Sequence, residues 1–342
     1  MRFFLDRYLR LLLLGLVTFF IYYYKDTFIH STQHAIMATE QKNEKLICTS
    51  RWEDDKNVWL IESTFQTYLK PEIICTLESY ASKMPQNCIR YVFLDSRVKI
   101  GKMKTQLKQS LGALYNNFDL ITMPAYDLFR GTPVYRVIGK LFHSKYKTNY
   151  LSDIGRAVLL YKYGGLYSDS DGFLARNIDE LGHSFIARNP NGNLASGFSA
   201  ARKKNLYLLE VLKRIAENFT PTGTYFQIFN IHIKTVKSYC TETCKVQSAV
   251  YGNNNHNNSQ CCELKLLASH HICNPNQEAE VSERNNCSFF HYAHSYNCLK
   301  GNYNRVFDIN SSKNSVSAMA RKHCPVVVQK YKRFIVTCAA KK

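Results

Sequence analysis

The chain has 342 residues and a formal net charge of +19, from 45 Lys and Arg against 26 Asp and Glu. This length allows one large hydrophobic core or a few smaller ones, and 45% hydrophobic with 13% aromatic residues excludes an intrinsically disordered chain. The basic excess fits a partner that carries phosphate, and it fits a solvated lysine-rich surface equally well. The basic residues are scattered, and no nucleic-acid-binding module is recognisable. We therefore expect no nucleic-acid partner.

The first predicted element is an apolar helix near the N-terminus. Three arginines in residues 1–10 precede an uncharged run from Leu11 to Tyr24. As a helix this run is about 21 Å long, short for a hydrocarbon core of about 30 Å, so a cleaved signal peptide is the alternative. Bulky residues follow it instead of a small-residue cleavage site. We therefore predict a cytoplasmic tail over 1–10, an uncleaved signal anchor over 11–25 and a lumenal remainder, as in a single-pass type II membrane protein.

Strands and helices are predicted to alternate after a polar stem over residues 26–57. Short runs rich in β-branched and aromatic residues indicate strands, and helically spaced apolar residues indicate helices. In chain order these are a strand over 58–63, a helix over 70–84, a strand over 89–95, a helix over 104–115 and a strand over 118–123. This alternation predicts βαβ units and a parallel sheet.

A helix from Tyr150 is predicted to end at Gly164 and Gly165, where a glycine after the last helical turn is expected. The run LYSDSD then reads as extended chain, and an amphipathic helix follows over 206–219. Beyond Cys240 the chain is polar and rich in turn residues. We accordingly divide the lumenal part into a domain over 58–230 and a Cys-rich region over 231–342.

The cysteines and glycosylation sequons indicate an oxidising compartment. The chain has 12 cysteines, and four N-x-S/T sequons begin at Asn218, Asn257, Asn286 and Asn310. We predict disulfides of unspecified pairing. A zinc site is the alternative, built from Cys240, Cys244, His270, His271 and Cys273, although paired C-x2-C spacing is absent.

Acidic residues cluster in this basic chain around the glycine pair. Asp153 and Arg156 are three residues apart and therefore share a face of the predicted helix. In extended chain Asp169 and Asp171 project to the same side and repel each other unless a cation lies between them. Carboxylates of this kind suit Mg²⁺ or Mn²⁺. A lone Asp-x-Asp is more often a solvated turn, but the adjoining helix pair favours a binding site.

Residues Ser152–Asp171 resemble the nucleotide-sugar signature of glycosyltransferases whose sugar-binding region contains the Asp-x-Asp motif. The resemblance extends to the alpha-1,4-glycosyltransferase family. Three further segments carry it: 61–85 with Cys75, Glu78 and Ser79, 127–134 with the sequence DLFRGTPV, and 292–297 with the sequence YAHSYN.

The resemblance implies a GT-A fold, that is, an α/β, Rossmann-like mixed sheet flanked by helices. It also implies retaining transfer of a hexose or N-acetylhexosamine, galactose or N-acetylgalactosamine first, from a UDP-sugar to a glycan or glycolipid acceptor in the Golgi. Since no nucleophile is identifiable, same-face attack is favoured over a covalent intermediate. By position, Asp169 and Asp171 would bind the metal and diphosphate. The donor would contact Asp153 and Arg156, the catalytic candidates, and also Glu62, Ser63 and Asp169.

The sequence also departs from the family pattern. Tyr296 replaces a Trp, although His294 remains as a candidate third metal ligand or a structural histidine. Ala195-Ser196 replaces an Asn-Gly unless Asn193 takes that place, and Ile228-Phe229 replaces a Gly-Pro. A non-catalytic descendant that binds a nucleotide sugar or glycan therefore stays open as the alternative function, and a metal-dependent hydrolase would need a base that we do not find.

Overall fold

The computed structural model describes residues 48, 56–64, 66–188, 194–239, 260–261, 264–267, 272–273, 288–291, 304–308, 315–331 and 333–337. Within these ranges no helix combines the length and apolar character needed to cross a membrane. The predicted anchor over 11–25, nearly all of the stem, the side chains of the alternative zinc site, and His294 and Tyr296 lie outside the described residues.

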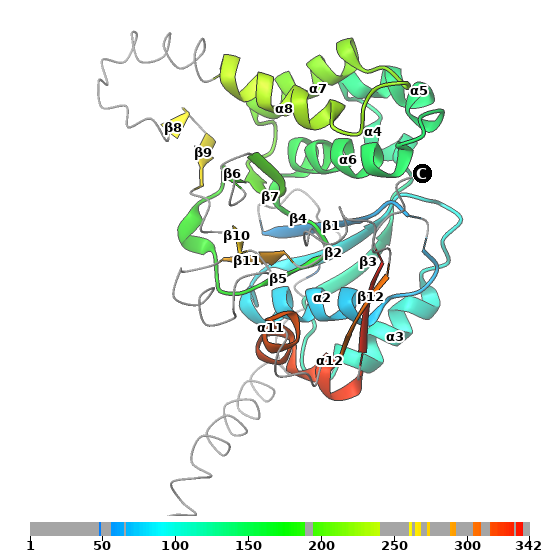
Figure 1. The fold of residues 1–342 in the computed structure, drawn as a ribbon, viewed down its shortest axis with the longest axis vertical. Coiled ribbons are helices and arrows are strands. Elements are labelled where there is room, and N and C mark those ends of the chain that lie inside the picture. The colour runs from blue at the N-terminus through cyan, green and yellow to red at the C-terminus, as the bar shows by residue number, and fades with distance from the viewer. Residues whose placement is uncertain are drawn as a thin grey trace, which may run out of the picture. The chain divides into compact units, whose positions relative to one another are not determined.

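A mixed sheet of eight strands forms the centre of the fold, in the order β3-β2-β1-β4-β7-β6-β9-β8 (Figure 1). Its strands are β1 (Asn57–Glu62), β2 (Cys88–Phe93), β3 (Phe118–Thr122), β4 (Gly165–Ser168), β6 (Phe185–Arg188), β7 (Leu194–Ala201), β8 (Gln260–Cys261) and β9 (Leu264–Leu266). The first four pair with one another in parallel, whereas β7 is antiparallel to both β4 and β6. The predicted parallel sheet is confirmed for this first half.

Helices cover both faces of the sheet (Figure 1). One face carries α2 (Pro71–Lys83), α3 (Gly101–Leu111), α11 (Ser315–His323) and α12 (Pro325–Lys330). The other carries α4 (Ala125–Phe129), η2 (Pro133–Val137), α5 (Ile138–Phe142), α6 (Lys147–Tyr163), α7 (Leu206–Asn218) and α8 (Gln227–Ser238). The remaining elements are η3 (Asp179–Leu181), the sheet of β5 (Gly172–Leu174), β10 (Ile272–Cys273) and β11 (Phe289–His291), and the pair β12 (Asn304–Asp308) and β13 (Arg333–Thr337).

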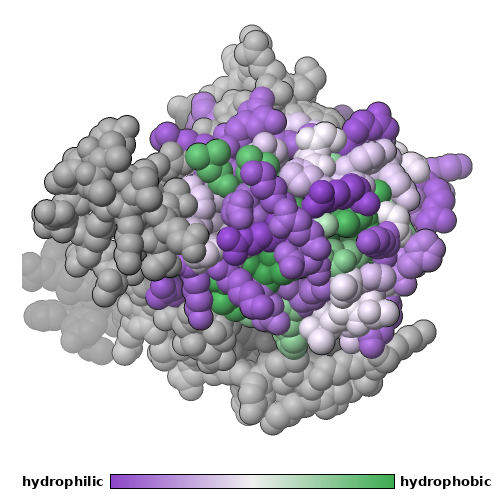
Figure 2. All heavy atoms as spheres, turned by 90° about the horizontal axis from the view of Figure 1, so that it is seen from above, coloured by the Kyte–Doolittle hydropathy of each residue, from purple (hydrophilic) through white to green (hydrophobic). Residues whose placement is uncertain are grey.

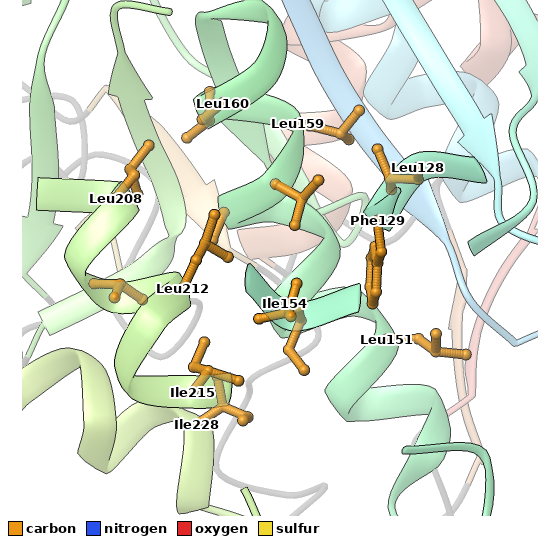
Figure 3. Close-up of a cluster of buried hydrophobic side chains, with 14 of the residues drawn as sticks. Leu128, Phe129, Leu151, Ile154, Leu159, Leu160, Leu208, Leu212, Ile215 and Ile228 are labelled. Carbon is orange, nitrogen blue, oxygen red and sulfur yellow. The ribbon is translucent and has the colours of Figure 1, made fainter. Parts of the chain in front are cut away.

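Each helical layer has its own hydrophobic core against the sheet. Beneath α2 the core includes Ile74 and Leu77, and on the opposite face Ile154 of α6 packs in a cluster with Leu212 of α7 and Phe129 (Figure 3). These side chains are fully buried. The outer surface over the α6 layer is mainly hydrophilic, with small hydrophobic groups between the polar side chains (Figure 2).

The glycine pair joins α6 to β4 where two other groups approach closely. Gly164 and Gly165 have φ values of 73° and 97°, which disfavour side chains. A Cβ on Gly165 would lie 2.3 Å from the carbonyl oxygen of Asn57. The Gly164 carbonyl accepts a hydrogen bond of 2.8 Å from Trp59 Nε1. The predicted helix end is confirmed, and the two glycines allow β4 to lie directly beside β1.

The predicted extended run is only partly correct. Strand β4 ends at Ser168, and the chain bends at Ser170 and Asp171 before β5 begins. The alternation argument for Asp169 and Asp171 therefore does not apply. A local contact accounts for the position of the bend, because the Thr76 hydroxyl of α2 donates to the Ser170 carbonyl at 3.0 Å.

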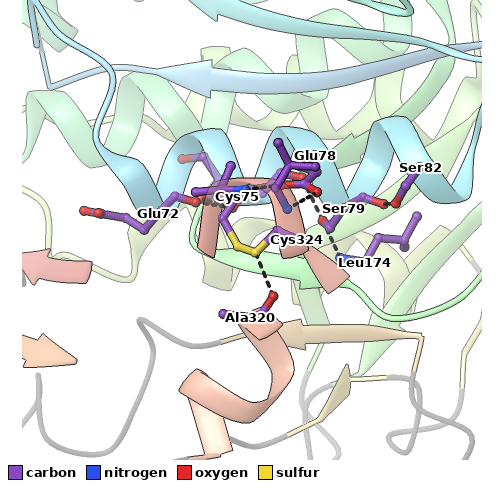
Figure 4. The surroundings of a disulfide bond; sticks show 12 residues. Glu72, Cys75, Glu78, Ser79, Ser82, Leu174, Ala320 and Cys324 are labelled. Carbon is purple, nitrogen blue, oxygen red and sulfur yellow. Dashed lines mark hydrogen bonds between the residues drawn. A yellow bond between two sulfur atoms is a disulfide. The ribbon is translucent and has the colours of Figure 1, made fainter. Parts of the chain in front are cut away.

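The predicted disulfides are confirmed where the structure describes both partners: Cys48 pairs with Cys88, and Cys75 with Cys324. The second bridge ties α2 to the residue before α12 (Figure 4). Beside it, both carboxylate oxygens of the buried Glu78 accept backbone hydrogen bonds of 2.9 Å at the start of α12. The Ser79 hydroxyl accepts a bond of 3.0 Å from the Leu174 amide in β5. This segment of the family resemblance therefore serves the fold.

Candidate active site

Two neighbouring strands end at the same edge of the sheet. Glu62 is the last residue of β1, and Asp169 directly follows β4. In the order β3-β2-β1-β4, the strands β2 and β3 lie on one side of β1, and β4 lies on the other side. The direction in which strands are added therefore reverses at β1. Open α/β sheets bind ligands outside the carboxyl ends of their strands at such a reversal. The topology therefore indicates a binding site between the ends of β1 and β4.

Three charged side chains predicted from the sequence meet at this edge. Arg156 Nη2 lies 2.9 Å from Asp153 Oδ1, one turn away on α6, and 3.2 Å from Asp169 Oδ1. The guanidinium thus bridges a helix and the end of a strand. The Asp153 and Asp169 side chains keep 27% and 19% exposure, so part of each carboxylate stays available to a ligand.

Arg156 is buried and fixed on several sides. Its Cζ lies 5.0 Å from the centre of the Tyr167 ring, and Nη1 donates to the Ser196 hydroxyl at 3.2 Å. Burial opposes the guanidinium charge, but the carboxylates around it raise the pKa of Arg156 overall. This arginine is a permanent, positioned cation, which suits contact with a phosphate or a sugar hydroxyl.

Asp169 is placed by its neighbours on β4 and β7. The Tyr167 hydroxyl donates to Asp169 Oδ1 at 3.0 Å, and the Asp169 amide donates to the Gly197 carbonyl at 2.7 Å. A Cβ at Gly197 would lie 2.1 Å from Asp169 Oδ2. A glycine is therefore required at position 197 for the carboxylate to occupy its observed position.

The donor set fits a divalent cation that also binds phosphate. Asp153, Asp169 and Asp171 all act electrostatically on Arg156, and three formal negative charges against one positive charge leave two negative charges. Mg²⁺ and Mn²⁺ are commonly held by one or two carboxylates together with phosphate oxygens. Within the described ranges, no group of three or more His, Cys, Asp and Glu side chains is arranged as a metal site, so Asp169 and Asp171 would need ligand oxygens to complete the shell.

Glu62 and Ser63 lie at the β1 end of this edge and are mostly buried. Glu62 Oε2 accepts a hydrogen bond of 2.9 Å from the Tyr91 hydroxyl, and Oε1 accepts from the Thr64 amide at 2.6 Å. The carboxylate is thus held in place by β2 and by the loop after β1. Among the ion pairs of the described residues, Arg156 is joined to Asp153 and Asp169 and not to Glu62.

The sequence did not single out three residues that contact or border the site. Tyr167 precedes Asp169 by two positions, so strand alternation could have placed both on one face. Ser196 was noted only as a departure from the family pattern. Tyr225 lies before α8, and the carboxylates of Asp153, Asp169 and Asp171 act on its hydroxyl. No local pattern marks that tyrosine, since the α7–α8 connection alone brings it to α6.

Comparison with known proteins supports the sequence resemblance. Residues 70–186 match the family described as glycosyltransferase sugar-binding region containing DXD motif. Lactosylceramide 4-alpha-galactosyltransferase of Homo sapiens is 25% identical over 128 residues, which are 36% of this chain and 36% of that protein. The Mus musculus protein of the same name is 24% identical over 165 residues, which are 48% and 46% of the two chains. The matched segments cover less than half of each relative.

Solved structures give weaker likenesses. PaToxG glycosyltransferase has a TM-score of 0.45 at 15% identity, covering 66% of this chain and 81% of that chain. The galactosyltransferase LgtC in complex with donor and acceptor sugar analogs has a TM-score of 0.35 at 12% identity, covering 80% and 95%. Scores of this size assign no fold, and the mixed α/β sheet flanked by helices is established by the elements described above.

Proposed function

We propose that this chain, whose residues 70–186 form a glycosyltransferase sugar-binding region, transfers a hexose or N-acetylhexosamine from a UDP-sugar to a glycan. Galactose and N-acetylgalactosamine are the first donors to test, with retention of configuration and an alpha-1,4 linkage. A glycosphingolipid is the expected acceptor. The relatives support this choice, because they are named as galactosyltransferases of lactosylceramide.

One observation carries the proposal: Arg156 joins Asp153 of α6 to Asp169 of β4 at the edge where β1 and β4 end. A module that binds only neutral glycans gains nothing from three carboxylates around a buried cation, because buried charges are costly unless a ligand or partner uses them. A donor with a diphosphate and a metal uses both signs of charge. This arrangement supports a GT-A domain over 58–230.

The proposed chemistry follows the charges. Cleavage of the sugar–phosphate bond leaves negative charge on UDP and positive charge at the anomeric carbon. A divalent cation, Mn²⁺ in our proposal, would be held by Asp169 and Asp171 and would act as a Lewis acid toward the diphosphate. Arg156 would bind a donor oxygen, and Asp153 would orient a donor hydroxyl and favour the developing positive charge. Glu62 and Ser63 would contact the nucleoside, and His294 would be a further metal ligand.

We further propose a Golgi location, with residues 11–25 as a signal anchor, 26–57 as a stem, and the catalytic domain and the Cys-rich region over 231–342 in the lumen. The two disulfides support an oxidising compartment. Microscopy of a full-length chain with a C-terminal tag, with and without residues 1–25, tests the anchor. A tag accessible to antibody only after lumenal membranes are permeabilised is the expected result.

The activity test uses the full-length chain in detergent and measures UDP release from UDP-galactose and UDP-N-acetylgalactosamine, with Mn²⁺ or with chelator. We expect Mn²⁺-dependent release, and a fall of about 100- to 1000-fold in Asp171→Asn because one charge of the metal site is lost. Asp127→Asn is the matched control, since this exposed carboxylate of α4 pairs only with Arg130 among described ion pairs. No release by a folded chain that still binds UDP or glycan would favour the non-catalytic alternative.

A further inference from the structure

Two adjacent aromatic side chains are exposed at the segment between α7 and α8. Tyr225 and Phe226 keep 41% and 55% of their surface accessible, and their ring centres lie 5.0 Å apart in an edge-on arrangement. Aromatic side chains commonly line ligand sites, because they supply apolar contact and, in tyrosine, a polar tip as well.

This aromatic pair lies beside the acidic site. The Tyr225 hydroxyl accepts a hydrogen bond of 3.3 Å from Asn149 Nδ2, and Asn149 is one turn before Asp153 on the same face of α6. Burial raises the pKa of Tyr225, and the carboxylates of Asp153, Asp169 and Asp171 raise it further. One wall of the site therefore runs along α6 from Arg156 through Asp153 to Asn149, and Tyr225 stands at its end.

The segment that carries the pair is fixed to α6. The Tyr150 hydroxyl donates to the Thr224 carbonyl at 2.5 Å. The Tyr146 ring packs edge-on against Tyr225, with ring centres 5.6 Å apart. The aromatic faces are thus held in position before a ligand arrives, which lowers the entropy cost of binding.

We propose that Tyr225 and Phe226 form the subsite for the acceptor sugar, an inference that rests on the proposed function. A pyranose has one face of C–H groups, which can pack on an aromatic ring, and a rim of hydroxyls, which suits Asn149 and the Tyr225 hydroxyl. The donor has other partners: its diphosphate belongs with Asp169 and Asp171, and its nucleoside with Glu62 and Ser63 at the β1 end. Tyr225 contacts Asn149, which lies on α6 one turn from Asp153, at the other end of the site from Glu62.

The test separates donor use from acceptor use in the full-length chain. UDP release without acceptor reports the donor site, and transfer to soluble methyl β-galactoside, lactose and N-acetyllactosamine reports the acceptor site. We expect Tyr225→Ala and Phe226→Ala each to raise the KM for the acceptor by about 10-fold. Acceptor-free UDP release and the KM for the UDP-sugar should stay within about twofold of wild type. Tyr225→Phe should keep most acceptor affinity, since it keeps the ring.

Tyr126→Ala is the matched control, since this tyrosine is 47% exposed and stacks on Phe142 of α5; its acceptor KM should not change. A raised KM for the UDP-sugar in Tyr225→Ala would assign the pair to the donor and overturn the inference. So would an effect confined to lipid-linked acceptors in phosphatidylcholine vesicles, which would indicate membrane contact. If the wild-type protein itself released no UDP from either UDP-sugar, the proposed function would be refuted instead.

Discussion

The two faces of the central sheet use carboxylates for different purposes. On the α2 face Glu78 is fully buried, and backbone amides of Val326 and Val327 occupy both of its oxygens. On the α6 face the Asp153 side chain is 27% exposed and pairs with Arg156. The first carboxylate is closed off from solvent, with each oxygen bonded to the backbone, whereas the second keeps exposed surface for a ligand. The motif segment around Glu78 therefore contributes to the fold, and the segment around Asp153 is the better candidate to bind a ligand.

The largest expected effect that tests this difference between the two faces is a loss of stability. Replacing Cys75 and Cys324 by alanine opens a bridge that spans 249 residues, and we expect the free energy of unfolding to fall by about 2–5 kcal/mol. Turnover per folded molecule should not change, because the bridge lies on the α2 face. Urea unfolding and UDP release on the same samples measure both quantities.

The matched control removes the other described bridge, Cys48–Cys88, with a separation of 40 residues. A shorter loop restricts the unfolded chain less, so this double variant should lose less stability. If the Cys75–Cys324 variant instead lost turnover at unchanged stability, the α2 face would take part in the chemistry. The assignment of a purely structural role to that face would then be wrong.

The pH dependence of Glu78 gives a somewhat smaller effect. Burial raises the pKa of Glu78 from 4.5 to about 7, although the Val326 and Val327 amides oppose this shift. Because the folded state then binds the proton more tightly than the unfolded state, this contribution to stability is fully present below pH 4.5. It is lost as the pH rises through 7, and by at most about 3 kcal/mol.

Glu78→Gln mimics the protonated carboxyl and should lack this dependence. The stability of wild type relative to the variant, from urea unfolding, should therefore be higher at pH 5 than at pH 8. Parallel curves for the two proteins would mean that Glu78 is ionised throughout and that the two amide bonds outweigh burial.

Much of the fold was predictable because its first half has strong local patterns. The strands β1, β2 and β3 and the helices α2, α3, α6 and α7 are confirmed within a few residues. The short elements between Ala125 and Phe142 carry too few residues for a periodic pattern, and tertiary packing decides them. The bend at Ser170 and Asp171 was missed because Thr76, 94 residues earlier, holds it.

The site was predictable where spacing alone brings residues together. Asp153 and Arg156 are three residues apart, and the predicted shared helix face is confirmed, with an ion pair between them. The glycine turn between their elements brings Arg156 and Asp169 into contact in the structure. From β7, Ser196 contacts Arg156 and Gly197 contacts Asp169, and from the α7–α8 connection Tyr225 contacts Asn149. Only the folded chain shows these contacts.

The smallest expected effect compares two tyrosines that hold carboxylates at the two ends of the site. Tyr167→Phe removes the 3.0 Å bond to Asp169, and Tyr91→Phe removes the 2.9 Å bond to Glu62. A partner of a metal ligand typically contributes about 10-fold or more to metal affinity or activity. Tyr167→Phe should thus raise the Mn²⁺ concentration needed for half-maximal UDP release by about 10-fold. Tyr91→Phe should instead raise the KM for the UDP-sugar at unchanged Mn²⁺ dependence. If UDP release depended on the Mn²⁺ concentration in the same way in both variants and in wild type, Asp169 would not be a metal ligand. The functional role given to the carboxylates on the α6 face, in contrast to Glu78, would then be wrong.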